Sequence, residues 1–450
     1  MDQIEEGDWM TDRQRYRKRI RRKPRFGVLI MVVAVLCAAF FFLGRCSVGH
    51  AEYDDSAENT DSQQDEEDYD VASDTSGDDA QIEASSLMQD SVSVQNHDVI
   101  QTMIDSIADK YNAVGIQVAV VENGVVTDSY ASGWATVEED LMTVEHKIRI
   151  ASISKVFIGM TAMLLQEDQV VDLDADFGTY WNTTARNPIY PDVPITIRDI
   201  LHHTSTIITY GDDYSTEYNA VLERLADGYY DSVPGDIDGR YYNNYAFRVL
   251  GMTLELAADR SIDDILYDEL FCDMEIDASF ASGDLRNTNM LATLYYKDGS
   301  VARSFEEQVA LHMPDTPGAD GKSFAGGLTI SAVDLAKLTA LLANDGIYNG
   351  KRYLQEDSVE QMEAYIPQQI YENGYQATPL FYEVGMYGRE GIYYHDGYAY
   401  GVTSCMSYDP LTGDGVVVLA TGADLESEVS GIALVCSEVN QYLYTLLDDA

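Results

Sequence analysis

A serine and a lysine stand three positions apart at the start of an apolar stretch, where Ser152 and Lys155 open the run SISKVFIGMTAMLL. Residues three apart on a helix face the same way, so the Lys155 amine can reach the Ser152 hydroxyl. Serine is a weak nucleophile until a nearby base takes its proton, and a buried lysine can be such a base. The spacing therefore predicts a nucleophile with its base. A capping serine followed by a surface lysine is the competing interpretation of so short a pattern.

A tyrosine and two asparagines precede a second apolar helical stretch, in GRYYNNYAFRVLG. A buried tyrosine can transfer protons and an asparagine can hydrogen-bond an amide, which makes Tyr242 and Asn244 candidates for these roles. An ordinary turn, with asparagine as the helix cap and tyrosine as packing, explains the same residues.

A third candidate is His395-Asp396-Gly397, which ends a predicted strand in GIYYHDG. Glycine at a strand end lets a ligand approach the backbone closely, and a strand edge can donate an N–H to an oxyanion. An Asp-Gly turn beside an exposed histidine is the alternative.

The elements that must position these residues follow from periodicity. Residues 98–112 have helical spacing, and two alternating segments meet at Asn123-Gly124, a strong hairpin signal. Helical patterns follow from Ser152 to about Leu342. Strand patterns return after Tyr382 in EVGMYG, GIYYH, GVTSCMSYD and GVVVLATG, before a closing helix in SGIALVCSEVNQYLYTLL. The predicted fold is α+β, with an antiparallel sheet flanked by the N- and C-terminal helices and a mostly helical region inserted.

Taken in order, the motifs resemble those of the serine β-lactamase-like family, which includes class C β-lactamases, penicillin-binding D-Ala-D-Ala carboxypeptidases and related esterases and D-aminopeptidases. The stretch IRIASISKVFIGMTAMLLQEDQVVDLDADF is similar to that family, as are IRDILHHTS, YYNNYAFRVLGMTLE, FAGGLTISAVDLAKLTALLANDGIYNGKRYL with EDSVEQM, and HDGYAYGVTSCMSYDP. The resemblance covers about residues 97–447. Each motif alone is common, but the ordered set of Ser-x-x-Lys, Tyr-x-Asn and His-x-Gly is specific.

The resemblance implies a role for each motif residue. Ser152 would be the acylated nucleophile, Lys155 its base and Tyr242 the proton-transfer partner; Tyr241 competes for that last role, but the distance to Leu250-Gly251 favours Tyr242. The substrate-binding residues would be Asn244, His395 and Gly397, with the backbone N–H groups of Ser152 and Tyr398 as the oxyanion hole.

Two departures from the family pattern concern the rim of the site. The usual HTSG reads His203-Thr204-Ser205-Thr206, and the Pro-Gly after the third motif reads Tyr400-Gly401. His395 also replaces the lysine of many relatives. An imidazole near its reference pKa of about 6.5 is mostly neutral at pH 7, so it binds a substrate carboxylate less firmly than lysine does. This favours a peptidase or an esterase over an efficient β-lactamase.

The N-terminal end predicts a membrane anchor. Phe26–Gly44 contains no charge, and a helix of this length spans roughly 28 Å, close to the hydrocarbon thickness of a bilayer. Basic residues from Arg13 to Arg25 precede it, so the N-terminus is predicted to be cytoplasmic and the rest extracytoplasmic. A cleaved secretory signal is less consistent with the bulky FFFLGRC that ends the span.

The predicted organisation is a basic tail at 1–25, the anchor at 26–44, an acidic linker at 45–95 and a hydrolase domain at 96–450. The linker is rich in carboxylates and poor in large apolar residues, so we expect an extended tether. The whole chain has 28 Lys and Arg against 77 Asp and Glu, a net charge of −49, which argues against nucleic acid as a partner.

We expect neither a metal nor another cofactor. The adjacent His202 and His203 lack further ligands at metal-binding spacing and are interpreted as structural. No calcium-loop pattern occurs in the acidic linker. Two of Cys272, Cys405 and Cys436 could form a disulfide outside the cell, but the sequence does not say which.

The sequence thus predicts a membrane-anchored, extracytoplasmic serine hydrolase that works through an acyl-enzyme. A D-Ala-D-Ala carboxypeptidase acting on peptidoglycan stem peptides is the first expectation, because such amides are accessible on that side of the membrane. A β-lactamase or an esterase of the same family is the first alternative. A catalytically silent wall-binding or signalling module is the second. The oligomeric state is left open.

Overall fold

The computed structural model describes residues 97–449, except 211–213, 237–238, 372–373, 378–379, 384, 425–427 and 430. By internal contacts the chain divides into Met1–Gln89 and Asp90–Ala450, and only the second unit contains described residues. The predicted tail, anchor and linker lie outside the described residues. Over the part that is described, no helix is long and apolar enough to cross a membrane.

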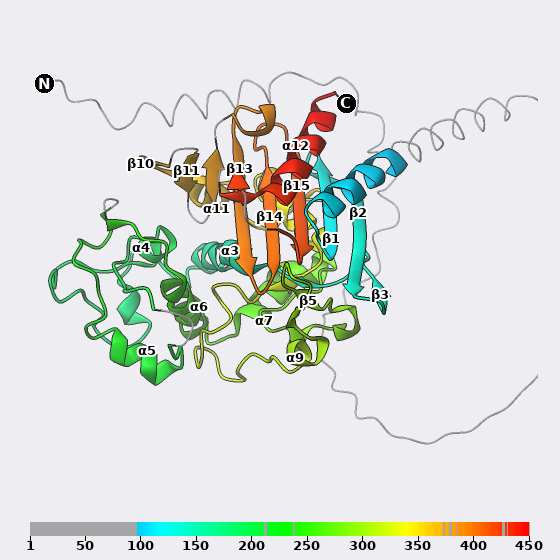
Figure 1. The fold of residues 1–450 in the computed structure, drawn as a ribbon. Coiled ribbons are helices and arrows are strands. Elements are labelled where there is room, and N and C mark those ends of the chain that lie inside the picture. Colours follow the sequence, from blue (N-terminus) through cyan, green and yellow to red (C-terminus); the bar gives the residue numbers. More distant parts are fainter. Residues whose placement is uncertain are drawn as a thin grey trace, which may run out of the picture. The chain divides into compact units, whose positions relative to one another are not determined.

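The second unit is built on a nine-stranded sheet whose neighbouring strands all pair antiparallel, in the order β10-β11-β12-β13-β14-β15-β1-β2-β3 (Figure 1). The strands are β1 Gly115–Glu122, β2 Val125–Thr136, β3 Asp140–Leu141, β10 Tyr365–Tyr371, β11 Gly374–Ala377, β12 Phe381–Glu383, β13 Ile392–Ala399, β14 Val402–Tyr408 and β15 Gly415–Thr421. Strands from the two ends of the chain meet where β1 pairs with β15. The sequence predicted this closure of the sheet by both ends of the chain.

Asn123 and Gly124 form the turn between β1 and β2, with φ of 52° and 79°. Positive φ at both central residues is what a tight two-residue hairpin requires. The hairpin prediction is confirmed.

Helices cover both faces of the sheet. On one face lie a helix over residues 97–110 and α12 (Leu434–Asp449), whose apolar side chains join those of β1 and β15 in one buried cluster (Figure 1). On the other face lies α10 (Ala332–Ala343), in a larger cluster shared with α3 and α6. Because β1 and β15 are buried on both faces, their sequences are almost continuously apolar.

The inserted region contains mostly short helices, as predicted. They are η1 Ala151–Ile153, α3 Ser154–Glu167, η2 Phe177–Thr179, α4 Ile197–Leu201, α5 Tyr218–Arg224, α6 Asn244–Ala258, α7 Ile262–Leu266, η4 Tyr267–Phe271, α8 Cys272–Met274, η5 Ser282–Asp284, η6 Thr288–Met290, α9 Phe305–Val309 and α11 Glu356–Glu363. Two-stranded ladders join β4 Ile148–Arg149 to β7 Thr329–Ile330, β5 Leu294–Tyr295 to β6 Val301–Arg303, and β8 Ile347–Tyr348 to β9 Lys351–Arg352; β16 Glu428–Val429 pairs with β17 Ile432–Ala433 near the end of the chain.

One predicted strand is wrong. The segment EVGMYG does not form the predicted strand, because β12 ends at its first residue, Glu383, and a short helix, η7, occupies Met386–Gly388. Gly385 and Tyr387 have φ of 77° and 54°, which are left-handed values incompatible with a strand. The strand pattern there came from the Tyr and Val content, which packing overrode.

Candidate active site

The predicted nucleophile and base meet. Ser152 lies in η1 and Lys155 in the first turn of α3, and the Lys155 Nζ donates to the Ser152 Oγ at 3.0 Å. The three-residue spacing therefore places the two side chains on one side, as expected. Ser152 lies just before the α-helix rather than within it.

The backbone before Ser152 adopts an uncommon conformation. Ala151 has a φ of 50°, although it is not a glycine. Such left-handed residues cost free energy and persist only where the surroundings hold them. Here the neighbouring Ile150 is held at both polar groups, because its N–H donates to the Leu328 carbonyl and its carbonyl accepts from the Ser404 hydroxyl, both at 2.9 Å. The turn that carries Ser152 is thus fixed from two other segments of the chain.

Burial lowers the pKa of the Lys155 amine. Its side chain is fully buried, and its Nζ also donates to the Ala325 carbonyl at 2.7 Å. Loss of solvation lowers the pKa of Lys155 to about 7, with Asp396 opposing and Arg248 reinforcing the shift. An amine with this pKa is about half neutral at pH 7, so it can accept a proton.

Tyr242 joins the same pair. Its hydroxyl is hydrogen-bonded to Ser152, and the Lys155 Nζ lies 4.9 Å from the centre of its ring. Burial raises the pKa of Tyr242 above its usual value, so the side chain remains a protonated phenol at neutral pH. Residues from two distant segments thus converge on one hydroxyl. Tyr241 is exposed and makes no such contact with Ser152.

His203 supports Tyr242. Its Nδ1 accepts the backbone N–H of Asn243 at 3.0 Å, and its ring lies 4.6 Å from the ring of Tyr242 and 4.8 Å from that of Phe247. Burial holds the pKa of His203 well below its usual value, so the ring is neutral and its Nδ1 can accept. From the sequence, His203 is interpreted only as a structural residue. No local signal connects it to Tyr242, because the contact bridges a long stretch of chain.

The two asparagines after Tyr242 have different environments. Asn243 caps α6: its side-chain oxygen accepts the Ala246 N–H at 2.9 Å, and its amide donates to the Ile207 carbonyl at 2.6 Å. Asn244, the predicted substrate ligand, is the first residue of α6 and is exposed to solvent. The cap expected as a competing explanation is therefore present, and Asn244 remains accessible for a ligand.

The third motif lies within a strand rather than at its end, which corrects the sequence prediction. β13 continues through Ala399 because its ladder with β14 extends to the pair Ala399↔Val402. On the opposite side, β12 pairs only with residues 392–394. Within the described residues, the edge of β13 from His395 onward therefore has no strand beside it. Tyr398, the predicted oxyanion-hole residue, lies in this part of β13.

Gly397 lies against the turn that carries the nucleophile. A Cβ added at Gly397 would lie 2.5 Å from the Ile150 carbonyl oxygen and 3.0 Å from the Ser152 nitrogen. Only glycine leaves room for β13 to approach the backbone of Ser152 this closely. The geometry thus gives a specific reason for the glycine of the third motif.

His395 lies in the interior of the site. It is 2% exposed, its ring packs edge-on against Phe381, and its Nδ1 lies 2.7 Å from the Asp396 carbonyl oxygen. Burial, helped by the Lys155 charge, lowers the pKa of His395 to about 3. The imidazole is therefore neutral at pH 7, more completely than its reference pKa implies.

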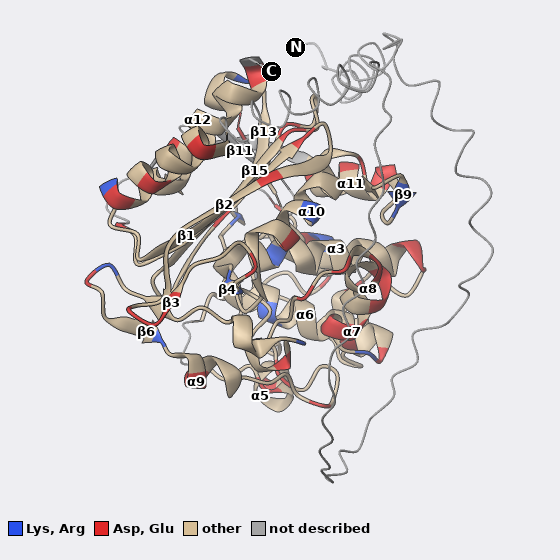
Figure 2. Cartoon of the chain, turned by 90° about the vertical axis from the view of Figure 1, so that its right-hand side faces the viewer, with Lys and Arg blue, Asp and Glu red and all other residues tan. Residues whose placement is uncertain are grey.

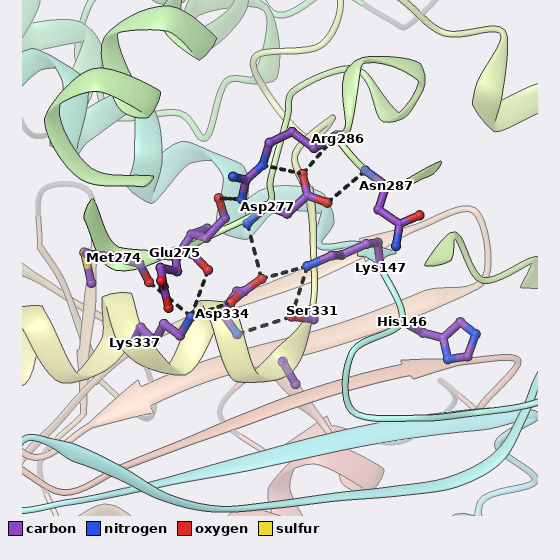
Figure 3. A network of polar contacts seen from close by, with 12 residues as sticks. His146, Lys147, Met274, Glu275, Asp277, Arg286, Asn287, Ser331, Asp334 and Lys337 are labelled. Carbon is purple, nitrogen blue, oxygen red and sulfur yellow. Dashed lines mark hydrogen bonds and ion pairs between the residues drawn. The ribbon is translucent and has the colours of Figure 1, made fainter. Parts of the chain in front are cut away.

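A buried ion network supports the strand that leads to Ser152. Figure 3 shows the carboxylate of Asp334 between two lysines: Lys147 Nζ lies 2.7 Å and Lys337 Nζ 2.9 Å from its oxygens. Burial alone would raise the pKa of Asp334, but the two amines hold it below its usual value. Because Lys147 directly precedes β4, the network ties the approach to the nucleophile to α10.

The rim positions that depart from the family pattern have left-handed backbones. Thr206 has a φ of 62° and Tyr400 a φ of 52°. The Thr206 hydroxyl accepts from the Asn187 amide at 3.1 Å, which holds this turn without a glycine.

Among the described residues, no group of three or more His, Cys, Asp or Glu side chains could hold a metal ion. Cys272, Cys405 and Cys436 are not joined in disulfides. The reactive groups gathered around Ser152 are thus an amine, a phenol and backbone N–H groups.

Comparison with known proteins identifies the family. A family model described as Beta-lactamase matches residues 100–435, well over half of the chain. The chain belongs to the beta-lactamase family. Its fold and its family thus agree with the resemblance carried by the three motifs. A comparison with curated proteins gave no significant match.

Several solved structures share the fold. An octameric penicillin-binding protein homologue from Pyrococcus abyssi aligns with a TM-score of 0.62 at 21% identity, over 78% of this chain and 77% of that one. A D-amino acid amidase from Ochrobactrum anthropi SV3 gives 0.61 at 22%, over 79% and 99%. A class C beta-lactamase from Rhodobacter sphaeroides gives 0.59 at 18%, over 77% and 99%.

Proposed function

We propose that this chain is a serine hydrolase that forms an acyl-enzyme on Ser152 and acts on peptides ending in D-amino acids. The observation that carries the proposal is the hydrogen bond from a fully buried lysine amine to the serine hydroxyl. A lysine in that position has a reduced pKa and can act as a base, whereas a surface lysine beside a capping serine cannot.

In the proposed reaction, the Ser152 Oγ attacks the carbonyl carbon while its proton passes to neutral Lys155. The backbone N–H groups of Ser152 and Tyr398 stabilise the developing oxyanion. The C–N bond then breaks, and the leaving amine receives a proton from Lys155 through the Tyr242 phenol. Water subsequently attacks the acyl carbon and gives a proton to Lys155. The bond from the acyl carbon to the Ser152 Oγ then breaks, Lys155 returns that proton to the Oγ, and the acid product leaves.

D-Ala-D-Ala carboxypeptidase activity on peptidoglycan stem peptides is the form of this reaction that we favour. The shared fold with a D-amino acid amidase supports an amide next to a D-residue as the scissile bond. The neutral His395 offers no cation, so the carboxylate of a C-terminal D-alanine or of a β-lactam would have to be bound by other groups. The basic segment and apolar span at 13–44 support an anchored, extracytoplasmic enzyme.

The test is covalent labelling of the full chain with a fluorescent penicillin and a fluorophosphonate, read as intact mass. We expect a label on Ser152 that is absent in Ser152→Ala and strongly slowed in Lys155→Met. Ser154→Ala is the matched control, because the Ser154 hydroxyl accepts the Leu328 N–H at 3.0 Å and has no part in the chemistry. Labelling that survives Ser152→Ala would refute the proposal.

Turnover separates the remaining alternatives. Release of D-alanine from a D-Ala-D-Ala peptide indicates the carboxypeptidase, whereas faster hydrolysis of nitrocefin or of a simple ester indicates a β-lactamase or an esterase. A stable acyl-enzyme with no turnover of any of the three indicates a silent penicillin-binding module.

A further inference from the structure

Two arginines pack on one tyrosine, close to the part of β13 that lies beyond its pairing with β12. The guanidinium carbons of Arg149 and Arg303 lie 4.7 Å and 4.2 Å from the centre of the Tyr400 ring. Both distances are within the range of a cation–π interaction. Arg149 comes from β4, Arg303 from β6 and Tyr400 from the turn between β13 and β14, and all three side chains are half-buried. We call these three residues the arginine pair and its tyrosine.

The fold fixes this cluster from two sides. Gly401 has a φ of 73°, and a Cβ there would lie 1.8 Å from the Tyr295 carbonyl oxygen, so the turn that carries Tyr400 packs directly on β5. β5 pairs with β6 through Leu294↔Arg303, which brings Arg303 to that turn. The backbone of the turn and the strand that carries Arg303 therefore form one packed unit.

The cluster is also connected to the catalytic lysine. The Arg149 Nε donates to the Gly326 carbonyl at 2.5 Å, and the preceding carbonyl, that of Ala325, accepts the Lys155 Nζ. Arg149 stands three residues before Ser152. The arginine pair therefore lies beside the site, next to the part of β13 that follows Gly397 and Tyr398.

The polar partners of Arg303 are informative in a chain with this charge. With 77 acidic residues against 28 basic ones, a basic side chain has many carboxylates available. Figure 2 shows acidic residues along the outer helices α7, α8, α11 and α12. Other arginines use them: Arg198, Arg260 and Arg389 each have an aspartate within 2.8 Å. In the part of the chain that the structure describes, the Arg303 guanidinium has neither a carboxylate nor a carbonyl as a hydrogen-bond partner, and it packs on the Tyr400 ring.

We propose that the arginine pair and its tyrosine bind a carboxylate carried by the acyl donor, remote from the bond that is cleaved. The proposal rests on the proposed acylation of Ser152. Gly397 touches the Ser152 backbone and Tyr400 follows three residues later, which at about 3.3 Å per residue is roughly 10 Å along the strand. A guanidinium matches the planar carboxylate with parallel hydrogen bonds, and two of them surround it with donors. The substrate class is thus an anionic acyl donor, such as a peptide with an acidic side chain roughly 10 Å from its scissile amide, on the acyl side.

The test uses the full chain and two matched substrates, the p-nitrophenyl monoester of suberic acid and the same compound with its far carboxylate blocked as a methyl ester. Both report Ser152 chemistry, and they differ only in the remote charge. We expect the wild type to favour the free carboxylate about tenfold in kcat/KM. Arg303→Gln and Arg149→Gln bring that ratio close to one, and Arg303→Glu reverses it.

Arg260→Gln is the control, because it removes the same charge from an exposed pair with Asp268 and should leave the ratio unchanged. Circular dichroism and the Tm identify any variant that fails to fold, and Arg303→Lys then reports on the same site with its charge retained. Equal kcat/KM values for the two esters in the wild type, or a ratio unchanged in both glutamine variants, overturn this inference and leave the proposed hydrolase intact. No Ser152-dependent cleavage of either ester is instead a failure of the proposed function.

Discussion

Lys155 is the residue whose environment most directly determines whether the site can remove a proton from Ser152. It is fully buried, donates to Ser152 and to the Ala325 carbonyl, and has its pKa lowered to about 7 by loss of solvation. The neighbouring His395 and Tyr242 are both neutral at pH 7, one by a lowered and the other by a raised pKa. Lys155 is therefore the group of this site that titrates near neutrality.

The kcat/KM for a neutral ester should fall about tenfold per pH unit below pH 7. Burial favours the neutral amine, and acidification returns the proton that blocks Lys155 as a base. A profile measured between about pH 5 and pH 9 should show one inflection near 7 and none from His395, whose pKa is about 3. Lys155→Arg should be inactive throughout this range, because arginine keeps its proton. A flat profile across neutrality contradicts the assignment of the base.

Gly397→Ala should disable the site and lower the free energy of unfolding by about 1–3 kcal/mol, the usual cost of overpacking. The new Cβ would lie 2.5 Å from the Ile150 carbonyl oxygen, so the turn that carries Ser152 must move away from β13. A displacement of about 1 Å at a nucleophile costs on the order of a hundredfold in rate. The matched control is Gly326→Ala, where the nearest atom would be at an ordinary 3.5 Å. Steady-state kinetics and the Tm of both variants are the measurements, and equal activity in the two would contradict the role of Gly397.

At the scale of elements, the buried Asp334 network joins α10 to the residue that precedes β4. The side chains of Lys147 and Asp334 are only 8% and 11% exposed, so neither charge has much solvent around it. Their attraction is strong in that environment, and the loss of one partner leaves the other buried and unpaired. The network therefore holds two elements on which the position of Ser152 depends.

Asp334→Ala should lower the free energy of unfolding by about 3–5 kcal/mol, because two lysines lose their only shared carboxylate. Asp273→Ala, which breaks an exposed pair with Lys351, should cost about 1 kcal/mol or less. Urea unfolding at pH 7 measures both. The Asp334 contribution should be complete above about pH 4 and lost as the pH falls through its lowered folded pKa. Equal costs for the two variants would contradict a buried network.

At the scale of the whole molecule, the charge is far from balanced. A net charge of −49 creates self-repulsion that opposes the compact state, while it keeps the protein soluble. Against this field, Arg149 and Arg303 place two positive charges at Tyr400, close to the active site.

Sodium chloride should therefore stabilise the full chain. Raising it from about 20 mM to about 0.5 M shortens the Debye length well below the size of the molecule and screens the repulsion. We expect the Tm to rise by a few degrees in a calorimetric scan. Chloride is preferable to sulfate, which strengthens apolar burial by another mechanism. A falling Tm would mean that exposed pairs such as Lys110–Glu438 contribute more than the repulsion does.

Local pattern alone was enough for several features of this protein. The i, i+3 spacing of Ser152 and Lys155, the Asn123-Gly124 turn and the apolar strands of the two chain ends all depend on neighbours within a few residues. Such features are encoded by periodicity and turn chemistry, which act at short range. The family could be inferred because the order of the three motifs is itself a property of the sequence.

The contacts, the burial and the pKa values of those residues depend on the tertiary structure. The neutral His203 beneath Tyr242, the fit of Gly397 against Ser152 and the meeting of Arg149 and Arg303 at Tyr400 join segments far apart in the chain. The continuation of β13 past His395 depended on its pairing with β14, so the predicted strand end was wrong. Burial and ladder pairing are set by long-range packing, and desolvation follows from burial. For that reason the lysine could be located from its spacing, but its lowered pKa could not.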